Sequence, residues 1–166
     1  MGAAERSFPI FVLAASVAIL GAALLSQYWG GLEPCELCLK ERWPWAAAIA
    51  VGSVATMSGS RRALPRVALL LTGVFAVGSA LAFYHVGVER HWFAGPAACT
   101  APAGTADTIE ALRAQLLHQL PVRCDQPAWS LWGISLAGWD LVASLAMAGI
   151  SFAVFWQCRP PGRRAI

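Results

Sequence analysis

The sequence predicts an all-α integral membrane protein, a four-transmembrane-helix bundle with a short amphipathic interfacial helix in its second outer loop. Of its 166 residues, 58% are hydrophobic and only 13% are charged, whereas a soluble domain usually carries about 25% charged residues. Four runs are almost free of charge, and each supplies the roughly 20 apolar residues that cross a bilayer core. No repeat or soluble domain interrupts them, so residues 1–166 are expected to form a single membrane domain.

Each span follows from one of these runs. Three runs contain no Asp, Glu, Lys or Arg, and the last contains only Asp140. Interfacial aromatic residues and turn-forming residues mark where each span begins and ends. The predicted spans are residues 8–28, 44–59, 67–86 and 134–156, and the predicted outer loops are residues 29–43 and 87–133. The first run is longer than the apolar part of a signal peptide, so a retained helix is expected. Pro44 is expected in the first turn of the second span, where its missing N–H is tolerated.

The basic residues indicate which side of the membrane each loop faces. One side carries Arg6, the arginines of residues 61–66 and those of residues 159–164, whereas the long loop on the other side is near neutral. Because cytoplasmic loops are enriched in Lys and Arg, both termini are expected in the cytoplasm. The outward side then holds four cysteines, where disulfides persist: Cys35, Cys38, Cys99 and Cys124. Cys158 lies at the inner end of the last span and is expected to be an inert thiol.

A short helix is predicted within the second outer loop. Asp107 and Glu110 have the spacing of a capping box, and apolar residues follow at helical intervals until Pro121: Ile109, Leu112, Leu116, Leu117 and Leu120. This amphipathic helix suits either the membrane interface or the surface of another helix of the protein. In both cases the loop carries one cysteine on each flank.

The segment Pro34-Cys35-Glu36-Leu37-Cys38-Leu39-Lys40-Glu41-Arg42 is the main candidate for chemistry. If it is helical, Pro34 suits the first helical position, and Cys35, Cys38 and Arg42 fall on one face. The positive end of the helix dipole and the Arg42 charge both favour thiolate over thiol. This combination predicts a redox site at the membrane surface.

Two other interpretations of the cysteines remain open. The four outward cysteines are also compatible with an all-cysteine zinc site or with two structural disulfides. Against zinc, Cys99 and Cys124 are not a closely spaced pair, and the compartment is oxidising. Against two structural disulfides, a membrane bundle has little need of such bonds, so the redox pair is preferred.

The other polar residues are expected to have simpler roles. Glu41 is expected to be solvated or paired with Lys40 or Arg42. His85, at the outer end of the third span, fits an interfacial hydrogen-bonding residue. Asp140 needs a buried hydrogen-bond partner or a place near the interface. Two further groups complete the set: His91 and His118 as solvated loop residues, and Trp129, Trp132 and Trp139 as interfacial anchors.

Taken together, these motifs resemble the disulfide bond formation protein B (DsbB) family. The resemblance lies in four spans, Pro-Cys-x-x-Cys-x-x-x-Arg after the first of them, and a cysteine pair in the second outer loop. The stretches Tyr84-His85-x-Gly87 and Arg123-Cys124-Asp125…Trp129…Trp139 also match bacterial members. The likeness covers nearly the whole chain.

The resemblance implies an enzyme of the bacterial inner membrane, a thiol:quinone oxidoreductase that reoxidises a periplasmic DsbA-like thioredoxin-fold protein. It implies that Cys99 forms the mixed disulfide with that partner, that Cys124 is its bonded mate, and that Cys35 exchanges with Cys124. Cys38 would be the thiolate beside the quinone, either ubiquinone or menaquinone. Arg42 would stabilise that charge, and His85 would lie near the quinone head.

Alternative functions follow from the same residues. A vitamin K epoxide reductase-like oxidoreductase also combines a membrane bundle with Cys-x-x-Cys, but it places that pair near its last helix, whereas here the pair follows the first span. A non-enzymatic membrane scaffold held by two disulfides predicts no quinone-dependent turnover. The sequence contains no glycine pattern for NAD or FAD binding.

Overall fold

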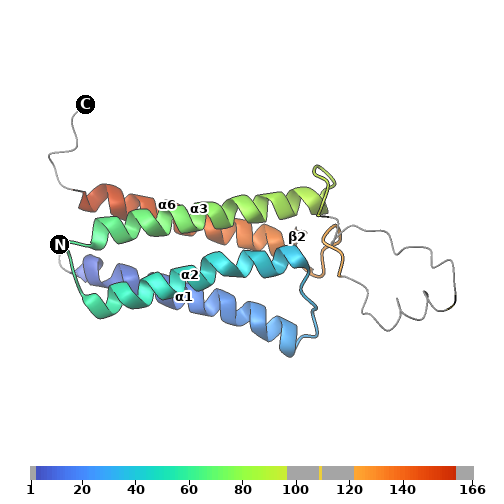
Figure 1. The fold of residues 1–166 in the computed structure, drawn as a ribbon, viewed down its shortest axis with the longest axis horizontal. Helices are drawn as coiled ribbons and strands as arrows, with labels where there is room; N and C mark the ends of the chain where they lie inside the picture. The colour runs from blue at the N-terminus through green and yellow to red at the C-terminus, as the bar shows by residue number, and fades with distance from the viewer. Residues whose placement is uncertain (1–2, 97–108, 110–121, 160–166) are drawn as a thin grey trace.

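The computed structural model of the protein describes residues 3–96, 109 and 122–159 and consists mainly of four long helices along a common axis (Figure 1). The helices are α1 (Ala3–Tyr28), α2 (Glu36–Ser58), α3 (Leu64–Glu89) and α6 (Leu136–Cys158). Before α6, the strands β1 (Ser130–Leu131) and β2 (Ile134–Ser135) form an antiparallel hairpin in which Ser130 pairs with Ser135. The chain is therefore helical, as predicted.

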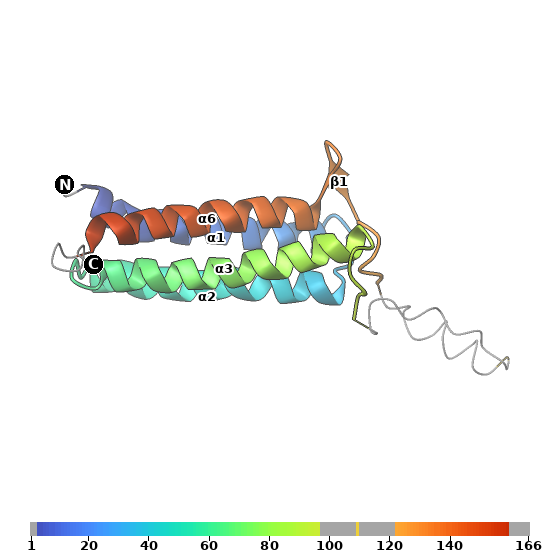
Figure 2. The same ribbon diagram turned by 90° about the horizontal axis from the view of Figure 1, so that it is seen from above.

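The helices alternate in direction, so functional residues from distant parts of the sequence meet at one end. α1 packs against α2, α2 against α3, and α3 most extensively against α6. In the view of Figure 2, where α6 is drawn over α1, α3 runs along α2, with which it is in contact. The end of α1, the start of α2, the end of α3 and the start of α6 share the end of the bundle that carries the hairpin (Figures 1 and 2).

The core lies along the bundle axis and is mostly apolar, with a few buried serines. Phe75 and Leu71 of α3 are fully buried, and Trp45 of α2 packs on Phe75 with ring centroids 5.3 Å apart. Many large apolar side chains point outward instead, among them Phe11, Leu25, Leu70, Phe83, Leu145 and Phe152. An apolar exterior around a helical core is the arrangement that a lipid solvent requires.

Among the residues that the structure describes, three helices have the length and composition to cross a membrane: Ser7–Tyr28, Leu64–Glu89 and Leu136–Cys158. α2 is not among them, because its first turns carry four charged residues, Glu36, Lys40, Glu41 and Arg42. The structure thus supports a helical membrane protein with three apolar helices of spanning length. A fourth crossing by α2 stays a prediction.

The expected place of Pro44 is wrong. α2 begins at Glu36, before the cysteine pair ends, so Pro44 lies inside the helix and not in its first turn. A proline there withholds the N–H that the Lys40 carbonyl would otherwise accept. Its ring is buried against α3 at Gly78, where an added Cβ would lie 3.2 Å from the Pro44 Cβ. Because Gly78 has no side chain, α2 and α3 approach each other closely at this proline.

The hairpin was not predicted from the sequence. Its two central residues, Trp132 and Gly133, both have positive φ, of 53° and 78°, as a tight two-residue hairpin turn requires. The predicted amphipathic helix of residues 109–120 lies, apart from Ile109, outside the described residues and stays a prediction.

Candidate active site

Cys35 caps the N-terminus of α2. Its backbone is extended (φ −73°, ψ 172°), and its Sγ accepts a hydrogen bond from the Cys38 N–H at 3.2 Å. Pro34 therefore precedes the cap and does not occupy the first helical position, which corrects the prediction for that residue. A sulfur in the cap position accepts an otherwise unbonded N–H at the positive end of the helix, and both effects favour its thiolate form.

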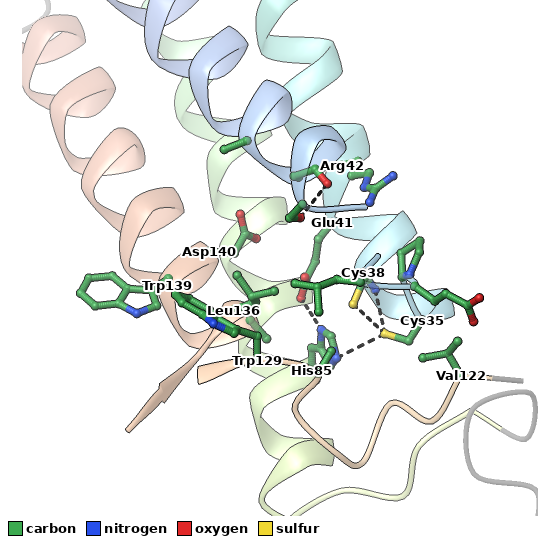
Figure 3. A pocket seen from close by; sticks show the side chains of 18 of the residues that line it. Cys35, Cys38, Glu41, Arg42, His85, Val122, Trp129, Leu136, Trp139 and Asp140 are labelled. Atoms are coloured by element: carbon green, nitrogen blue, oxygen red, sulfur yellow. Dashed lines mark hydrogen bonds and ion pairs between the residues drawn. The ribbon is translucent and has the colours of Figure 1, made fainter. Parts of the chain in front are cut away.

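The two sulfurs of Cys35 and Cys38 lie 2.8 Å apart, and both residues are thiols in this structure (Figure 3). The hydrogen bond from the Cys38 thiol lowers the pKa of Cys35 to about 4, assisted by His85 and by the Cys38 N–H and opposed by burial. The same hydrogen bond, together with burial, raises the pKa of Cys38. The reduced pair thus holds one negative charge on Cys35 and keeps the remaining proton on Cys38. The resemblance to the DsbB family implied instead that Cys38 is the thiolate.

His85 and Glu41 form a buried pair behind the cysteines. The Glu41 Oε1 lies 2.8 Å from the His85 Nδ1, and the opposite ring nitrogen, Nε2, lies 3.6 Å from the Cys35 Sγ (Figure 3). Glu41 is only 8% exposed, so the expectation of a solvated side chain is wrong. The carboxylate fixes the ring orientation and thereby directs the His85 Nε2 at the Cys35 sulfur.

Arg42 contacts α1. Its Nη1 donates to the Gln27 Oε1 at 2.7 Å, which links the start of α2 to the end of α1. Lys40 pairs with Glu36 at 2.6 Å and so does not pair with Glu41. Arg42 still lines the same cavity as Cys35 and Cys38. The charged Arg42 side chain is therefore part of the wall of the cavity that the two cysteines also line.

A cavity of about 560 Å³ lies beside the cysteine pair and is lined by residues of all four helices (Figure 3). Most of its wall is apolar: Ile19, Leu20, Ala23, Val122, Trp129, Leu136 and Ala143. Asp140 also lines it and accepts a hydrogen bond from the Trp45 Nε1 through Oδ1 at 2.7 Å, which confirms the expected buried partner. In the described part of the chain, the Asp140 Oδ2 and the Trp139 Nε1 are buried polar atoms without a partner.

Two of the remaining cysteines, Cys124 and Cys158, lie among the described residues, one near each end of the bundle. Cys124 is fully buried and disulfide-bonded, and it packs in one apolar cluster with Cys35, Leu37 and Val88. Because its sulfur is used in a disulfide, the four-cysteine zinc site is wrong for this structure. Cys99 lies outside the described residues, and Cys158 is half-buried at the far end of α6.

Comparison with known proteins gives the family. The family model described as "Disulfide bond formation protein DsbB" matches residues 5–154. The chain belongs to the DsbB family. It is accordingly a thiol oxidoreductase of disulfide bond formation.

Several curated relatives named disulfide bond formation protein B share the family. The one from Methylococcus capsulatus is 29% identical over 84% of this chain and 87% of its own length. The one from an Azoarcus species is 30% identical over 81% and 83%, and the one from Haemophilus influenzae is 30% identical over 83% and 79%. No solved structure matches this DsbB-family chain.

Three features of the site were missed in the sequence. Glu41 stands three residues after Cys38, on the face of α2 that carries the cysteines, and this spacing was the available signal. Gln27 gave no signal beyond its place at the end of the first span. Trp139 was expected at the membrane interface, yet it lines the cavity with a buried indole N–H.

Proposed function

We propose that this chain reoxidises a periplasmic DsbA-like thiol protein and passes the electrons through two cysteine pairs to a membrane quinone, either ubiquinone or menaquinone. One observation carries the proposal. The reduced Cys35–Cys38 pair forms part of the wall of a largely apolar cavity, at the end of the bundle where buried, disulfide-bonded Cys124 also packs. A thiol pair, a second disulfide and a space for an apolar acceptor are the parts that such a relay needs.

The cysteine steps are two balanced exchanges. The dithiol of the partner attacks the disulfide of Cys124, for which Cys99 is the proposed mate, and leaves as a disulfide while those two cysteines become thiols. These thiols then reduce a Cys35–Cys38 disulfide, which regenerates the Cys99–Cys124 bond and leaves the reduced pair. Packing of Cys124 in one cluster with Cys35 supports the second exchange, because disulfide exchange requires direct sulfur attack.

The cavity suits a quinone head. Its volume of about 560 Å³ lies within the range of about 300–1,000 Å³ that is usual for small-ligand sites. The quinone carbonyls need hydrogen-bond donors, and the Trp139 Nε1 is a buried donor without a partner among the described residues. We propose that Trp139, Arg42 and His85 hold the head against the cysteine pair. When bound, a quinone would accept two electrons as the pair becomes a disulfide, together with the Cys38 proton and a second proton from a neighbouring group.

The residues around the sulfurs then control charge and protons. Cys35 is held as a thiolate by the Cys38 thiol, by the Cys38 N–H and by His85. Cys38 keeps its proton until the disulfide forms. His85, oriented by Glu41 and in contact with the Cys35 thiolate, is the proposed donor of the second proton that the quinone takes up.

We further propose the topology that this chemistry needs. α2 crosses the membrane as a fourth span, both termini are cytoplasmic, and the cysteine pairs are periplasmic in a bacterial inner membrane. Arg61 and Arg62, which join α2 to α3, support this orientation, because they stand at the end opposite the cysteines. The interfacial helix of the second loop would keep the Cys99–Cys124 region close to the membrane surface.

A coupled assay tests the proposed function. Purified chain, a reduced DsbA-like protein and a soluble quinone analogue are mixed, and partner oxidation and quinone loss are followed together. Cys35→Ser and Cys38→Ser should each abolish both signals, and Cys99→Ser should block transfer from the partner. Partner oxidation that persists in Cys38→Ser would refute the relay, and the absence of any quinone-dependent turnover would favour the non-enzymatic scaffold.

Arg42 has its own test in this assay. Arg42→Gln removes the charge from the cavity wall, so we expect quinone reduction to slow at least tenfold and the quinone analogue to bind more weakly. Gln27→Ala is the matched control, since it removes the α1 contact of Arg42 but leaves the charge. Unchanged turnover and affinity in Arg42→Gln would make the residue an interface anchor only.

A further inference from the structure

Three potential metal ligands meet at the active site. The Cys35 Sγ, the Cys38 Sγ and a ring nitrogen of His85 lie within 4.8 Å of one another. The Cys35 Sγ and the His85 Nε2 are 3.6 Å apart, which is about the separation that one tetrahedral zinc ion imposes on a sulfur and a nitrogen ligand. The two sulfurs, at 2.8 Å, must separate by about 1 Å to reach the spacing of two thiolates on zinc. Cys38 lines the cavity, so its side chain has room for that rotation.

We propose that the reduced Cys35–Cys38 pair and His85 together bind one thiophilic divalent cation of the Zn²⁺ class. Two thiolates match the charge of such an ion, and sulfur with imidazole is a donor set that Zn²⁺ prefers. Binding displaces two protons to solution, the thiol proton of Cys38 and the proton on the His85 Nε2. This site uses three ligands from two helices and differs from the four-cysteine site that the sequence suggested.

Glu41 completes the arrangement as a positioning residue. Its Oε1 lies 2.8 Å from the His85 Nδ1, and both side chains are buried. In metal sites a ligating histidine almost always donates its other ring N–H to a carboxylate or carbonyl, which fixes the ring and raises the basicity of the ligating nitrogen. Here that hydrogen bond leaves Nε2 directed at the Cys35 sulfur.

The fourth coordination position faces the cavity, where water or another small ligand completes the tetrahedron. Metal binding is also coupled to the redox state, because a Cys35–Cys38 disulfide has no thiolate left to ligate. A bound ion therefore holds the pair reduced and stops electron transfer. Metal binding at this site therefore inhibits any redox reaction that the Cys35–Cys38 pair performs.

The test uses the full-length chain in detergent with Cys99→Ser, Cys124→Ser and Cys158→Ser, so that only the two site sulfurs remain. The anaerobically reduced protein is titrated with Zn²⁺ against a chromophoric chelator, without quinone or thiol partner. We expect one Zn²⁺ per reduced chain and none after oxidation to the disulfide. Co²⁺ in place of Zn²⁺ should give sulfur-to-metal charge-transfer absorption.

Variants locate the ligands. His85→Gln should weaken Zn²⁺ binding at least tenfold, Glu41→Gln should weaken it by about 10- to 100-fold, and His91→Gln, in an exposed loop, should leave it unchanged. Far-UV circular dichroism checks each fold. If His85→Gln does not fold, Glu41→Gln still decides the matter, because it keeps all three ligands.

Two results would overturn the proposal. One is Zn²⁺ binding by the reduced chain no tighter than that of a chain that also carries Cys35→Ser and Cys38→Ser. The other is equal binding before and after oxidation. Neither result bears on quinone-dependent turnover, so the proposed function stands or fails separately.

Discussion

Replacing His85 by glutamine should make Cys35 a weaker acid and the Cys35–Cys38 disulfide a weaker oxidant. In the structure, the His85 Nε2 lies 3.6 Å from the Cys35 Sγ and is one of the groups that lower the pKa of Cys35 from 9.0 to about 4. Loss of the imidazole removes a stabilising contact that acts on the thiolate and not on the thiol. The pKa of Cys35 must therefore rise, and the reduced form must lose stability relative to the disulfide.

The size of the effect follows from the geometry. A hydrogen bond to a charged group contributes about 1.5–3 kcal/mol, and the long contact to sulfur in this pair argues for the lower value. One pKa unit corresponds to about 1.4 kcal/mol, so the pKa of Cys35 should rise by about one unit. The same free energy lowers the reduction potential of the pair by about 30 mV.

Thiolate absorbance in the ultraviolet measures the pKa of Cys35 directly. A full-length chain that retains only Cys35 and Cys38 is reduced anaerobically in chelator-treated buffer and titrated with acid. The thiolate signal should persist from neutral pH down to about 5 and disappear near pH 4, since a lowered pKa keeps the group ionised above that value. His85→Gln should move the midpoint upward by about one unit, and His91→Gln should not move it. A parent midpoint near 9, or an unchanged midpoint in His85→Gln, would refute the reasoning.

Two further predictions concern stability and are measured by denaturant unfolding of the chain in detergent. Trp45→Phe leaves the Asp140 carboxylate without its hydrogen bond and should lower the free energy of unfolding by about 1–3 kcal/mol. The double variant Trp45→Phe/Asp140→Leu should restore most of that stability. Equal losses in the single and double variants would contradict this prediction. Gly87→Ala places a Cβ in a clash with the Phe93 ring, which packs against Tyr84, and should cost about 1–3 kcal/mol. Gly149→Ala, with nothing within 4 Å, is its control and should be neutral or stabilising.

The helices and the cysteine face were predictable from local sequence. Long charge-free runs fix the positions of helices because a bilayer accepts few alternatives, and three of these helices have spanning length in the structure. Helical periodicity likewise groups Cys35, Cys38 and Arg42, all of which line one cavity.

Features set by distant residues were not predictable. Glu41 and Arg42 are neighbours on α2, and the choice of which one is buried depends on His85 in another helix. The start of α2 is set by the Cys35 cap and not by Pro44, and a buried cap is not visible in local composition. The Trp132–Gly133 turn uses a positive φ at tryptophan, which is rare for a bulky residue.

The most direct test of the electron relay is a single turnover of its last step. A chain with Cys99→Ser, Cys124→Ser and Cys158→Ser is reduced, freed of reductant and metal, and mixed anaerobically with a soluble quinone analogue. The relay predicts that each chain reduces one quinone and ends with a Cys35–Cys38 disulfide, and that an added Cys38→Ser abolishes the reaction. Quinone reduction that survives Cys38→Ser, or a reduced pair that leaves the quinone unchanged, would contradict the proposal that electrons leave the protein through this pair.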